Sequence, residues 1–259
     1  MNFSLSITTI FISILSSANC LDCTFAASYP KHTVTYKLDS TIDIDGKLDE
    51  AAWSEVGWSE EFVDISTTEE PRLKTRMKMR WDEDWLYVAA ELEETQIWAN
   101  ITETCHCINE DQDQVIFHDN DFEVFIDVDG SNHNYKEFEI NAANQTWILM
   151  LTRPYADGGI ENSSRVLGEA GYDMQPPLTC GVDIQPREAL NNPSVPGRLW
   201  TVEVAMPMEK ILEHSLHPSR RPRDGDYWRI NFSRVEWRVK GQFHLSRRKS
   251  GLVQHKGVI

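Results

Sequence analysis

The sequence predicts an all-β protein, an antiparallel β-sandwich of jelly-roll type with one or two short helices. Its dominant pattern is the alternation of apolar and polar residues that half-buried strands require. The alternating segments are short, follow one another at fairly regular spacing and are bounded by Pro, Gly or Asp. Helical periodicity is confined to two short segments, and many strands with few helices are typical of a sandwich.

Each element follows from this alternation. His32–Leu38 predicts a first strand, and Arg76–Leu92 predicts a hairpin that turns at Asp82–Asp84. Phe122, Val124 and Ile126 are expected to form the next inward-facing row. Later strands are expected at 138–140, 147–151, 178–184, 199–207 and 226–237. Helices are expected within Leu48–Val56 and after Pro207, and residues 154–177 are expected to form surface loops.

Residues 1–20 have the character of a signal peptide. The apolar run Phe3–Leu15 is too short to span a bilayer, and small residues follow it. We expect residues 21–259 to form a single domain that is secreted, extracellular and monomeric, with no membrane span. The net charge of −16, from 41 acidic and 25 basic residues, argues against nucleic acid as a partner. Such a charge serves solubility or a cation site.

If the protein is secreted, its cysteines are expected to form disulfide bonds and its sequons to carry glycans. Five cysteines occur, and an oxidising compartment predicts disulfide bonds whose pairing stays open. Cys105, His106 and Cys107 resemble metal ligands, but no second cluster has zinc spacing, so disulfides are favoured there. N-glycosylation is predicted at Asn100, Asn144 and Asn162.

The segment "VIFHDNDFEVFIDVDGSNHNYKEFEINAANQTWILML" (Val115–Leu151) combines strand alternation with a dense set of carboxylates and amides. If its strands pair, Glu123 and Glu139 converge on one polar face, and Asn141 shares that face with Glu139. The face could be a solvated sheet surface, a catalytic acid pair, or a surface that binds a hydroxyl-rich ligand. A sugar site needs charged acceptors and amides for the hydroxyl groups, and aromatic rings for the C–H face.

The turn "DVDGSN" offers oxygen ligands for a cation. Asp127, Asp129 and Asn132 carry groups of the kind that calcium prefers, although the spacing is not that of an EF-hand. Asp and Asn also dominate ordinary turns. Both interpretations stay open, and calcium is the one cofactor that the sequence predicts.

Five segments, in order, carry a resemblance to a known family: "IDIDGKLDEAAWSEV", "RWDEDWLYVAAELEE", "IFHDNDFEVFIDVDGSNHNYKEFEINAANQTW", "WTVEVAMP" and "DYWRINFSRVEW". The stretch from about Thr41 to Trp237 resembles the family 9 carbohydrate-binding modules, and most closely their stand-alone, family 9-like branch. The resemblance implies a glycan-binding β-sandwich, commonly with structural calcium, linked to carbohydrate catabolism through glycan-degrading enzymes.

The resemblance also implies site residues. It places an aromatic ring at Phe117, with His118 beside it, and a sugar-binding glutamate at Glu123. Glu139 and Asn141 complete the expected polar patch. The family's second aromatic residue belongs near the C-terminus, where "SGLVQHKGVI" has no tryptophan, and the final strand is also expected to be missing. We therefore expect weak binding, or none until the missing C-terminal strand is restored.

Two other classes of function stay open. Glu123 and Glu139 could act as the acid pair of a glycoside hydrolase, although the resemblance implies binding without cleavage. No Gly-x-Ser-x-Gly elbow, phosphate loop or His-Glu-x-x-His helix occurs. A haem-binding sandwich would need ligands such as Met77, Met79, His118 and His133. Methionines at alternating strand positions are more typical of core packing.

Overall fold

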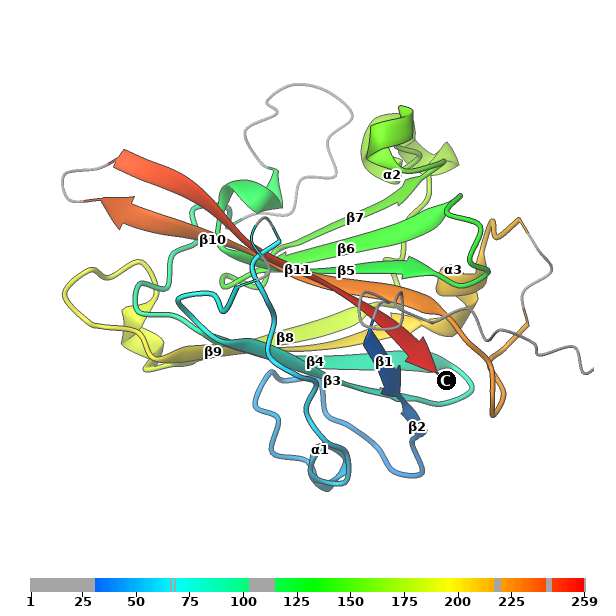
Figure 1. Ribbon diagram of the computed structural model, residues 1–259, viewed down its shortest axis with the longest axis horizontal. Helices are drawn as coiled ribbons and strands as arrows, with labels where there is room; N and C mark the ends of the chain where they lie inside the picture. The colour runs from blue at the N-terminus through cyan, green and yellow to red at the C-terminus, as the bar shows by residue number, and fades with distance from the viewer. Residues whose placement is uncertain are drawn as a thin grey trace, which may run out of the picture.

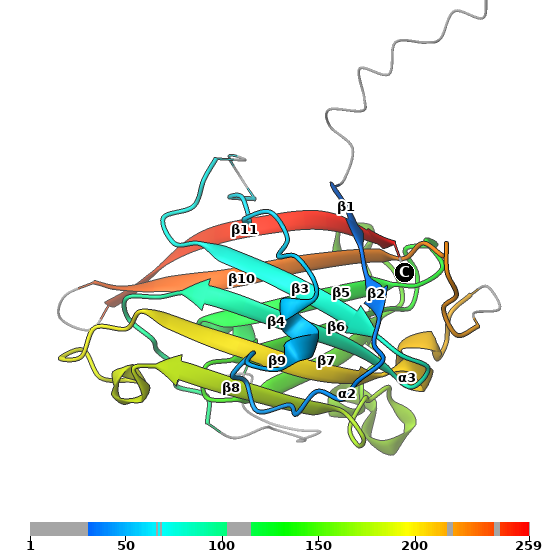
Figure 2. The same cartoon turned by 90° about the horizontal axis from the view of Figure 1, so that it is seen from below.

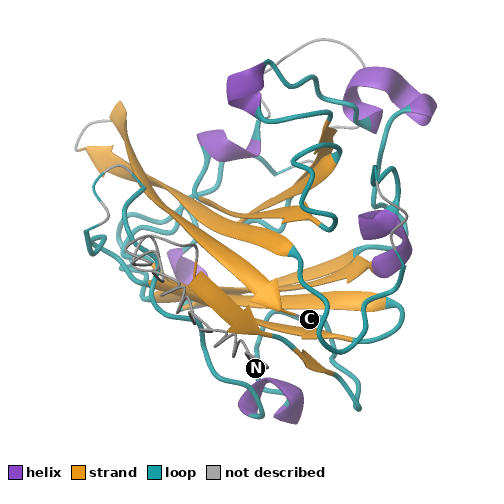
Figure 3. Cartoon of the chain, turned by 45° about the vertical axis from the view of Figure 1, so that its right-hand side comes forward, coloured by secondary structure: helices purple, strands orange, loops and turns teal. Residues whose placement is uncertain are grey.

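The structure, a computed structural model, describes residues 31–65, 67, 69–102, 115–216, 220–240 and 244–258, and beyond residue 237 it describes the backbone alone. Two β-sheets stack face to face (Figures 1 and 3), which confirms the predicted all-β sandwich. Sheet A contains, in spatial order, β1 (Lys31–Val34), β11 (His244–Val258), β10 (Arg229–Lys240), β5 (Asp121–Asp127), β6 (Tyr135–Asn141) and β7 (Thr146–Leu151). Sheet B contains β2 (Tyr36–Lys37), β3 (Thr75–Trp81), β4 (Trp85–Glu93), β9 (Leu199–Pro207) and β8 (Thr179–Gln185). Neighbouring strands are antiparallel, except for the parallel pairs β1–β11 and β2–β3.

Short helices lie around the sheets. Helix α1 (Ala51–Ser54) covers the outer face of sheet B (Figure 2), and α3 (Met208–Leu212) follows β9, both within the predicted segments. The region 154–177, expected to be loops, contains η4 (Tyr155–Asp157), α2 (Ser164–Leu167) and η5 (Gly168–Ala170). The described residues also contain the short helices η3 (Ile116–His118) and η6 (Arg187–Ala189). Within the described residues, no helix is long and apolar enough to cross a membrane.

Two strand predictions were wrong. The segment His32–Leu38 does not form one strand: β1 pairs with β11 in sheet A, whereas β2 pairs with β3 in sheet B. The chain changes sheets at Thr35, which is buried and whose carbonyl accepts a hydrogen bond from Trp81 Nε1 at 3.2 Å. The final strand that we expected to be missing is present as β11, paired with β10. Backbone pairing does not need the family's tryptophan, so the lack of that motif did not remove the strand.

The core lies between the two sheets and follows strand parity. Phe122, Val124 and Ile126 face inward and are fully buried, as predicted. Met77 and Met79 belong to the same apolar core from the side of sheet B. They therefore serve packing, and their thioethers do not meet His118 or His133, which are both exposed.

A carboxylate joins two of the segments that carry the family resemblance. Glu203, on β9 in "WTVEVAMP", accepts hydrogen bonds from the backbone N–H groups of Asp45 (3.0 Å) and Gly46 (2.7 Å) and from Trp53 Nε1 (2.7 Å). Gly46 has a φ of +90°, and a Cβ atom there would lie 2.6 Å from the backbone nitrogen of Asp183. The motif "DGKLDEAAW" is therefore held on sheet B by one acceptor and one obligatory glycine.

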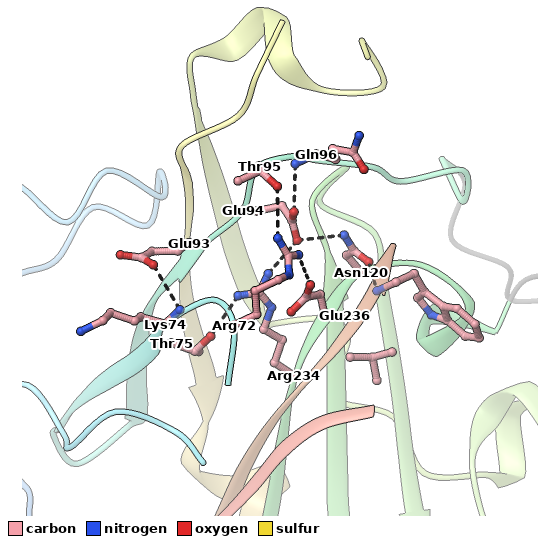
Figure 4. Close-up of polar contacts among 12 residues, drawn as sticks. Arg72, Lys74, Thr75, Glu93, Glu94, Thr95, Gln96, Asn120, Arg234 and Glu236 are labelled. Atoms are coloured by element: carbon pink, nitrogen blue, oxygen red, sulfur yellow. Dashed lines mark hydrogen bonds and ion pairs between the residues drawn. The ribbon is translucent and has the colours of Figure 1, made fainter. Parts of the chain in front are cut away.

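A second buried carboxylate ties the two sheets together (Figure 4). Arg234 of β10 donates from Nη2 to Glu94 Oε2 at 2.8 Å, and the side chains are 3% and 1% exposed. Arg234 also donates to Thr75 Oγ1 at 3.1 Å. Asn120 donates to Glu94 Oε2 at 3.2 Å and accepts the backbone N–H of Trp237 at 2.6 Å. This network fixes the end of β4 against sheet A and holds the residue before β5 in place.

We predict that Glu94→Ala lowers the free energy of unfolding by about 3–5 kcal/mol, because it removes the carboxylate that accepts a hydrogen bond from the buried Arg234 guanidinium. The neighbouring exposed residue provides a matched control: Glu93→Ala should change stability by less than about 0.5 kcal/mol. Urea denaturation of the two variants measures the difference. Equal stabilities would show that the ion pair does not join the sheets as described.

Candidate functional site

The outer face of sheet A carries a polar row across four strands. In the register, Ser233 of β10 lies opposite Glu123 of β5, Glu123 opposite Glu139 of β6, and Glu139 opposite Trp147 of β7. The predicted convergence of Glu123 and Glu139 is thus present. Parity puts the whole row on the face opposite to the core.

The carboxylates of this face are covered rather than solvated. Glu139 is 1% exposed, Glu123 is 9% exposed, and Asp121 and Glu137 are also buried. The Ser233 hydroxyl donates a hydrogen bond to Glu123, and the Tyr155 hydroxyl donates to Glu137 Oε2 at 2.9 Å. The interpretation as an ordinary solvated sheet surface is therefore wrong for these residues.

Burial changes the acidity of the group. Desolvation, followed by repulsion from Glu123, raises the pKa of Glu137 to about 8. Desolvation also raises the pKa of Asp121 and that of Glu139 well above their ordinary values, with further increases from the neighbouring carboxylates. Glu137 and Glu139 therefore hold their protons more tightly than exposed carboxyls do.

Aromatic rings lie at the end of the carboxylate row. The ring of Phe117, on η3, is half-buried, and its centroid is 5.8 Å from that of Trp147 with a tilt of 32°. His118 meets Phe117 edge-on at 4.9 Å and is exposed. Trp237 Nε1 donates to the carbonyl oxygen of Phe117 at 2.9 Å, which holds η3 against β10. Arg165 stacks on the Trp147 ring at 5.0 Å.

Trp147 is the residue of this site that the sequence analysis missed. It was assigned only to a strand, yet it is the direct neighbour of Glu139 across the β6–β7 pair. Its indole nitrogen is buried and has no hydrogen-bond partner. The alternation in "NQTWILML" already put Trp147 and Leu149 on one face. The length of the β6–β7 turn sets the register of the two strands, so it was the signal that could have placed Trp147 beside Glu139.

Asn141 differs from the other predicted site residues because its amide is already engaged. Its Nδ2 donates to the carbonyl of Ile101 (2.8 Å) and to Asp119 (3.1 Å). Its Oδ1 accepts the backbone N–H groups of Ala143 and Gln145, both at 3.0 Å. Asn141 is fully buried, so a direct contact with a ligand would require these bonds to break. Its predicted binding role stays a prediction.

The turn predicted to bind calcium is held by contacts within the chain. Asp127 Oδ2 accepts the N–H of Asn132 at 3.0 Å, and Asp129 Oδ1 accepts the N–H of Ser131 at 2.9 Å. The guanidinium of Arg229 donates to Asn132 Oδ1 at 3.1 Å and to the carbonyl of Gly130 at 2.8 Å. The guanidinium of Arg229 thus already contacts one of the three predicted side chains, Asn132. Calcium binding at Asp127, Asp129 and Asn132 stays a prediction.

The remaining predicted features divide between the described residues and those outside them. Cys180 has a free, partly buried thiol whose pKa burial raises to about 11. Residues 1–20, Cys23, Cys105 and Cys107 lie outside the described residues, so the signal peptide and the disulfide bonds stay predictions. Asn100 and Asn144 are exposed, whereas Asn162 is partly buried.

Fold and site together define a two-sheet β-sandwich with an aromatic and carboxylate patch on one outer face. The chain belongs to the carbohydrate family 9 binding domain-like family, whose sequence profile matches residues 44–174, half of the chain. Comparison with curated proteins gives no match.

Two solved structures share the fold. The first is a putative carbohydrate-binding protein from Bacteroides uniformis ATCC 8492, at 13% identity and a TM-score of 0.55 over 89% of this chain and 91% of that one. The second is a family 9 carbohydrate-binding module from Caldicellulosiruptor kristjanssonii in complex with glucose, at 15% identity and a TM-score of 0.52 over 87% of this chain and 95% of that one.

We predict that the stability of the cation-free protein falls as the pH rises from about 5 to about 8. A carboxyl group whose pKa is higher in the folded state than in the unfolded state binds more protons when folded, so raising the pH through that window favours unfolding. For Glu137 the window runs from 4.5 to about 8, and Glu203, with a pKa raised by burial to about 7, acts in the same direction.

Urea denaturation in chelator at several pH values measures this slope. Glu137→Gln should make the slope shallower, whereas the control Glu169→Gln, at an exposed position, should leave it unchanged. A stability that rises over this pH range would contradict the assignment of protonated carboxyls to the outer face of sheet A.

Proposed function

We propose that this chain is a secreted, non-catalytic carbohydrate-binding protein that holds a glycan on the outer face of sheet A. The observation that carries the proposal is the aromatic pair Phe117 and Trp147 at the end of the Glu123–Glu139 row. Membership of the family and the glucose complex of the Caldicellulosiruptor module support it.

The geometry suggests a role for each residue. Phe117 and Trp147 offer ring faces for the C–H surface of a sugar, and Trp147 Nε1 is a donor without a partner in the chain. Glu123 is the more exposed carboxylate of its pair and suits a hydroxyl group, with His118 beside the rings as a further polar contact. Glu139, almost wholly buried, would act mainly through Glu123 and Trp147.

Trp147 supplies a second aromatic ring in place of the tryptophan that is lacking near the C-terminus. Weak binding was expected because one of the family's two rings was absent. With Trp147 beside Phe117, the chain has two rings, although tilted neighbours cannot enclose a sugar from opposite sides.

Burial argues against the hydrolase alternative. One oxygen of Glu123 lies within 4.8 Å of one oxygen of Glu139, a separation that resembles the carboxyl spacing of retaining glycosidases, about 5–5.5 Å. A nucleophile or acid must reach the glycosidic bond, however, and Glu139 is only 1% exposed. We therefore propose binding without cleavage, by a chain that acts as a monomer.

Glycan-array screening of the mature protein, followed by calorimetry with the best ligand, tests the proposal. We predict that Trp147→Ala lowers the affinity by at least about tenfold, since it removes one of the two rings. Glu123→Gln should lower it by roughly ten- to a hundredfold, because hydrogen bonds to charged groups contribute roughly 1.5–3 kcal/mol. Phe117→Ala should have a smaller effect.

The matched control is Trp58→Ala, which removes a half-buried tryptophan that stacks with Arg76 of sheet B at 4.4 Å. Its affinity should equal that of the wild type. Binding that survives both Trp147→Ala and Glu123→Gln would place the site elsewhere. Release of reducing sugar that Glu123→Gln abolishes would make the protein a hydrolase.

We also predict N-glycosylation of the secreted protein, and the structure ranks the sequons. Asn144 is exposed in the β6–β7 turn and Asn100 is exposed, whereas Asn162 is partly buried with its side-chain oxygen shielded. Glycopeptide mass spectrometry after expression in animal cells should find Asn144 occupied and Asn162 much less so. Asn144→Gln should remove one glycan and Asn162→Gln should leave the mass of attached glycan unchanged. Retention of residues 1–20 in the recovered protein would contradict the proposal that the protein is secreted.

A further inference from the structure

Three carboxylates from adjacent strands meet on the outer face of sheet A. One oxygen each from Asp121, Glu123 and Glu139 lie within 4.8 Å of one another. Asp121 and Glu123 project from the same side of β5, and Glu139 lies directly opposite Glu123 on β6. Sheet register therefore fixes the arrangement, since both strands lie in the interior of sheet A.

Two oxygens of this cluster are buried without any partner. Asp121 uses Oδ1 to accept the backbone N–H of Val235 at 3.1 Å, while its Oδ2 accepts nothing. Glu139 Oε2 also lacks a hydrogen-bond partner, and both side chains are more than nine-tenths buried. Among the side chains that the structure describes, no Lys or Arg forms an ion pair with Asp121 or Glu139. Buried oxygens in native proteins nearly always have a partner, so these two indicate a ligand.

We propose that Asp121, Glu123 and Glu139 together bind a divalent, oxygen-seeking cation of the calcium type. Calcium takes carboxylate oxygens at 2.3–2.6 Å, so two ligands on opposite sides of the ion are about 4.6–5.2 Å apart. Magnesium, at 2.0–2.1 Å, would require opposite ligands within about 4.2 Å. The three oxygens lie within 4.8 Å of one another, close enough for one calcium ion to contact all of them. The cation would supply the positive charge that the surrounding described side chains do not.

This site is distinct from the turn Asp127–Asn132, where the guanidinium of Arg229 already contacts the loop oxygens. It also differs from the second acidic group of the chain, Asp45, Glu50 and Glu203. There, the most buried carboxylate, Glu203, accepts three N–H bonds from the chain itself. The proposal does not depend on the glycan function, because it rests on the buried oxygens alone.

Cation titration of the full secreted chain, first stripped with chelator, tests the site. Calorimetry with calcium and magnesium gives affinities, and terbium emission excited through tryptophan reports proximity, because Trp147 is the cross-strand neighbour of Glu139. We expect calcium to bind more tightly than magnesium and to raise the melting temperature, as any ligand specific for the folded state must. Terbium emission should appear and be displaced by calcium.

The isosteric variants Asp121→Asn and Glu139→Gln should each lower the calcium affinity at least tenfold and abolish the sensitised terbium emission. The matched control Asp129→Asn, in the Asp127–Asn132 turn, should bind calcium as the wild type does. In chelator, both site variants should melt no lower than the wild type, because an amide removes a buried acid that lacks a partner.

Three outcomes would overturn the proposal. One is a wild-type protein whose melting temperature and terbium emission do not respond to cations. Another is binding that Asp129→Asn removes while Asp121→Asn and Glu139→Gln retain it. The third is a loss of stability of both site variants in chelator, which would make the carboxyls structural hydrogen-bonding groups.

Discussion

Arg234 and Glu94 form an ion pair in the interior between the sheets, and the placement of the outer-face site depends on it. Breaking such a pair leaves a charge in a medium that solvates it poorly, so the two strands that carry it cannot separate without a large cost. Asn120 joins the same carboxylate and receives the backbone N–H of Trp237. Asn120, which directly precedes β5, is thereby fixed in place. It lies between Phe117 and Asp121 in the chain, so both of these site residues are positioned by it.

The consequence reaches the aromatic pair through the backbone. Trp237 donates its indole N–H to the carbonyl of Phe117, while its backbone N–H binds Asn120. The position of the Phe117 ring over Trp147 is thus set by contacts that lead back to the sheet-to-sheet ion pair. A rigid support of this kind suits a binding surface, because little side-chain freedom is lost when a ligand arrives.

The sequence predicted the features that depend on local periodicity. Alternation alone identified the inward row Phe122, Val124 and Ile126 and the convergence of Glu123 with Glu139. It failed where the outcome depends on distant segments. The hydrogen bonds that Asn141 donates to Ile101 and Asp119 join it to residues far away in the chain. The placement of β1 and β2 in different sheets, and the pairing of β11, likewise depend on which sheet edges are free to pair. No local sequence pattern contains that information.

Two carboxylates on the outer faces of the sandwich show how a structural acid differs from a candidate ligand. Glu203 on sheet B and Glu139 on sheet A are both buried, and burial raises the pKa of each. Glu203 is surrounded by N–H donors from one continuous segment, so the fold itself supplies its partners. Glu139 has the carboxylates of Asp121, Glu123 and Glu137 nearby and an oxygen with no donor. A buried glutamate therefore stabilises the fold at Glu203, where the chain supplies its hydrogen-bond donors. At Glu139 the chain supplies no donor to one oxygen, so a proton or a cation must come from outside the chain.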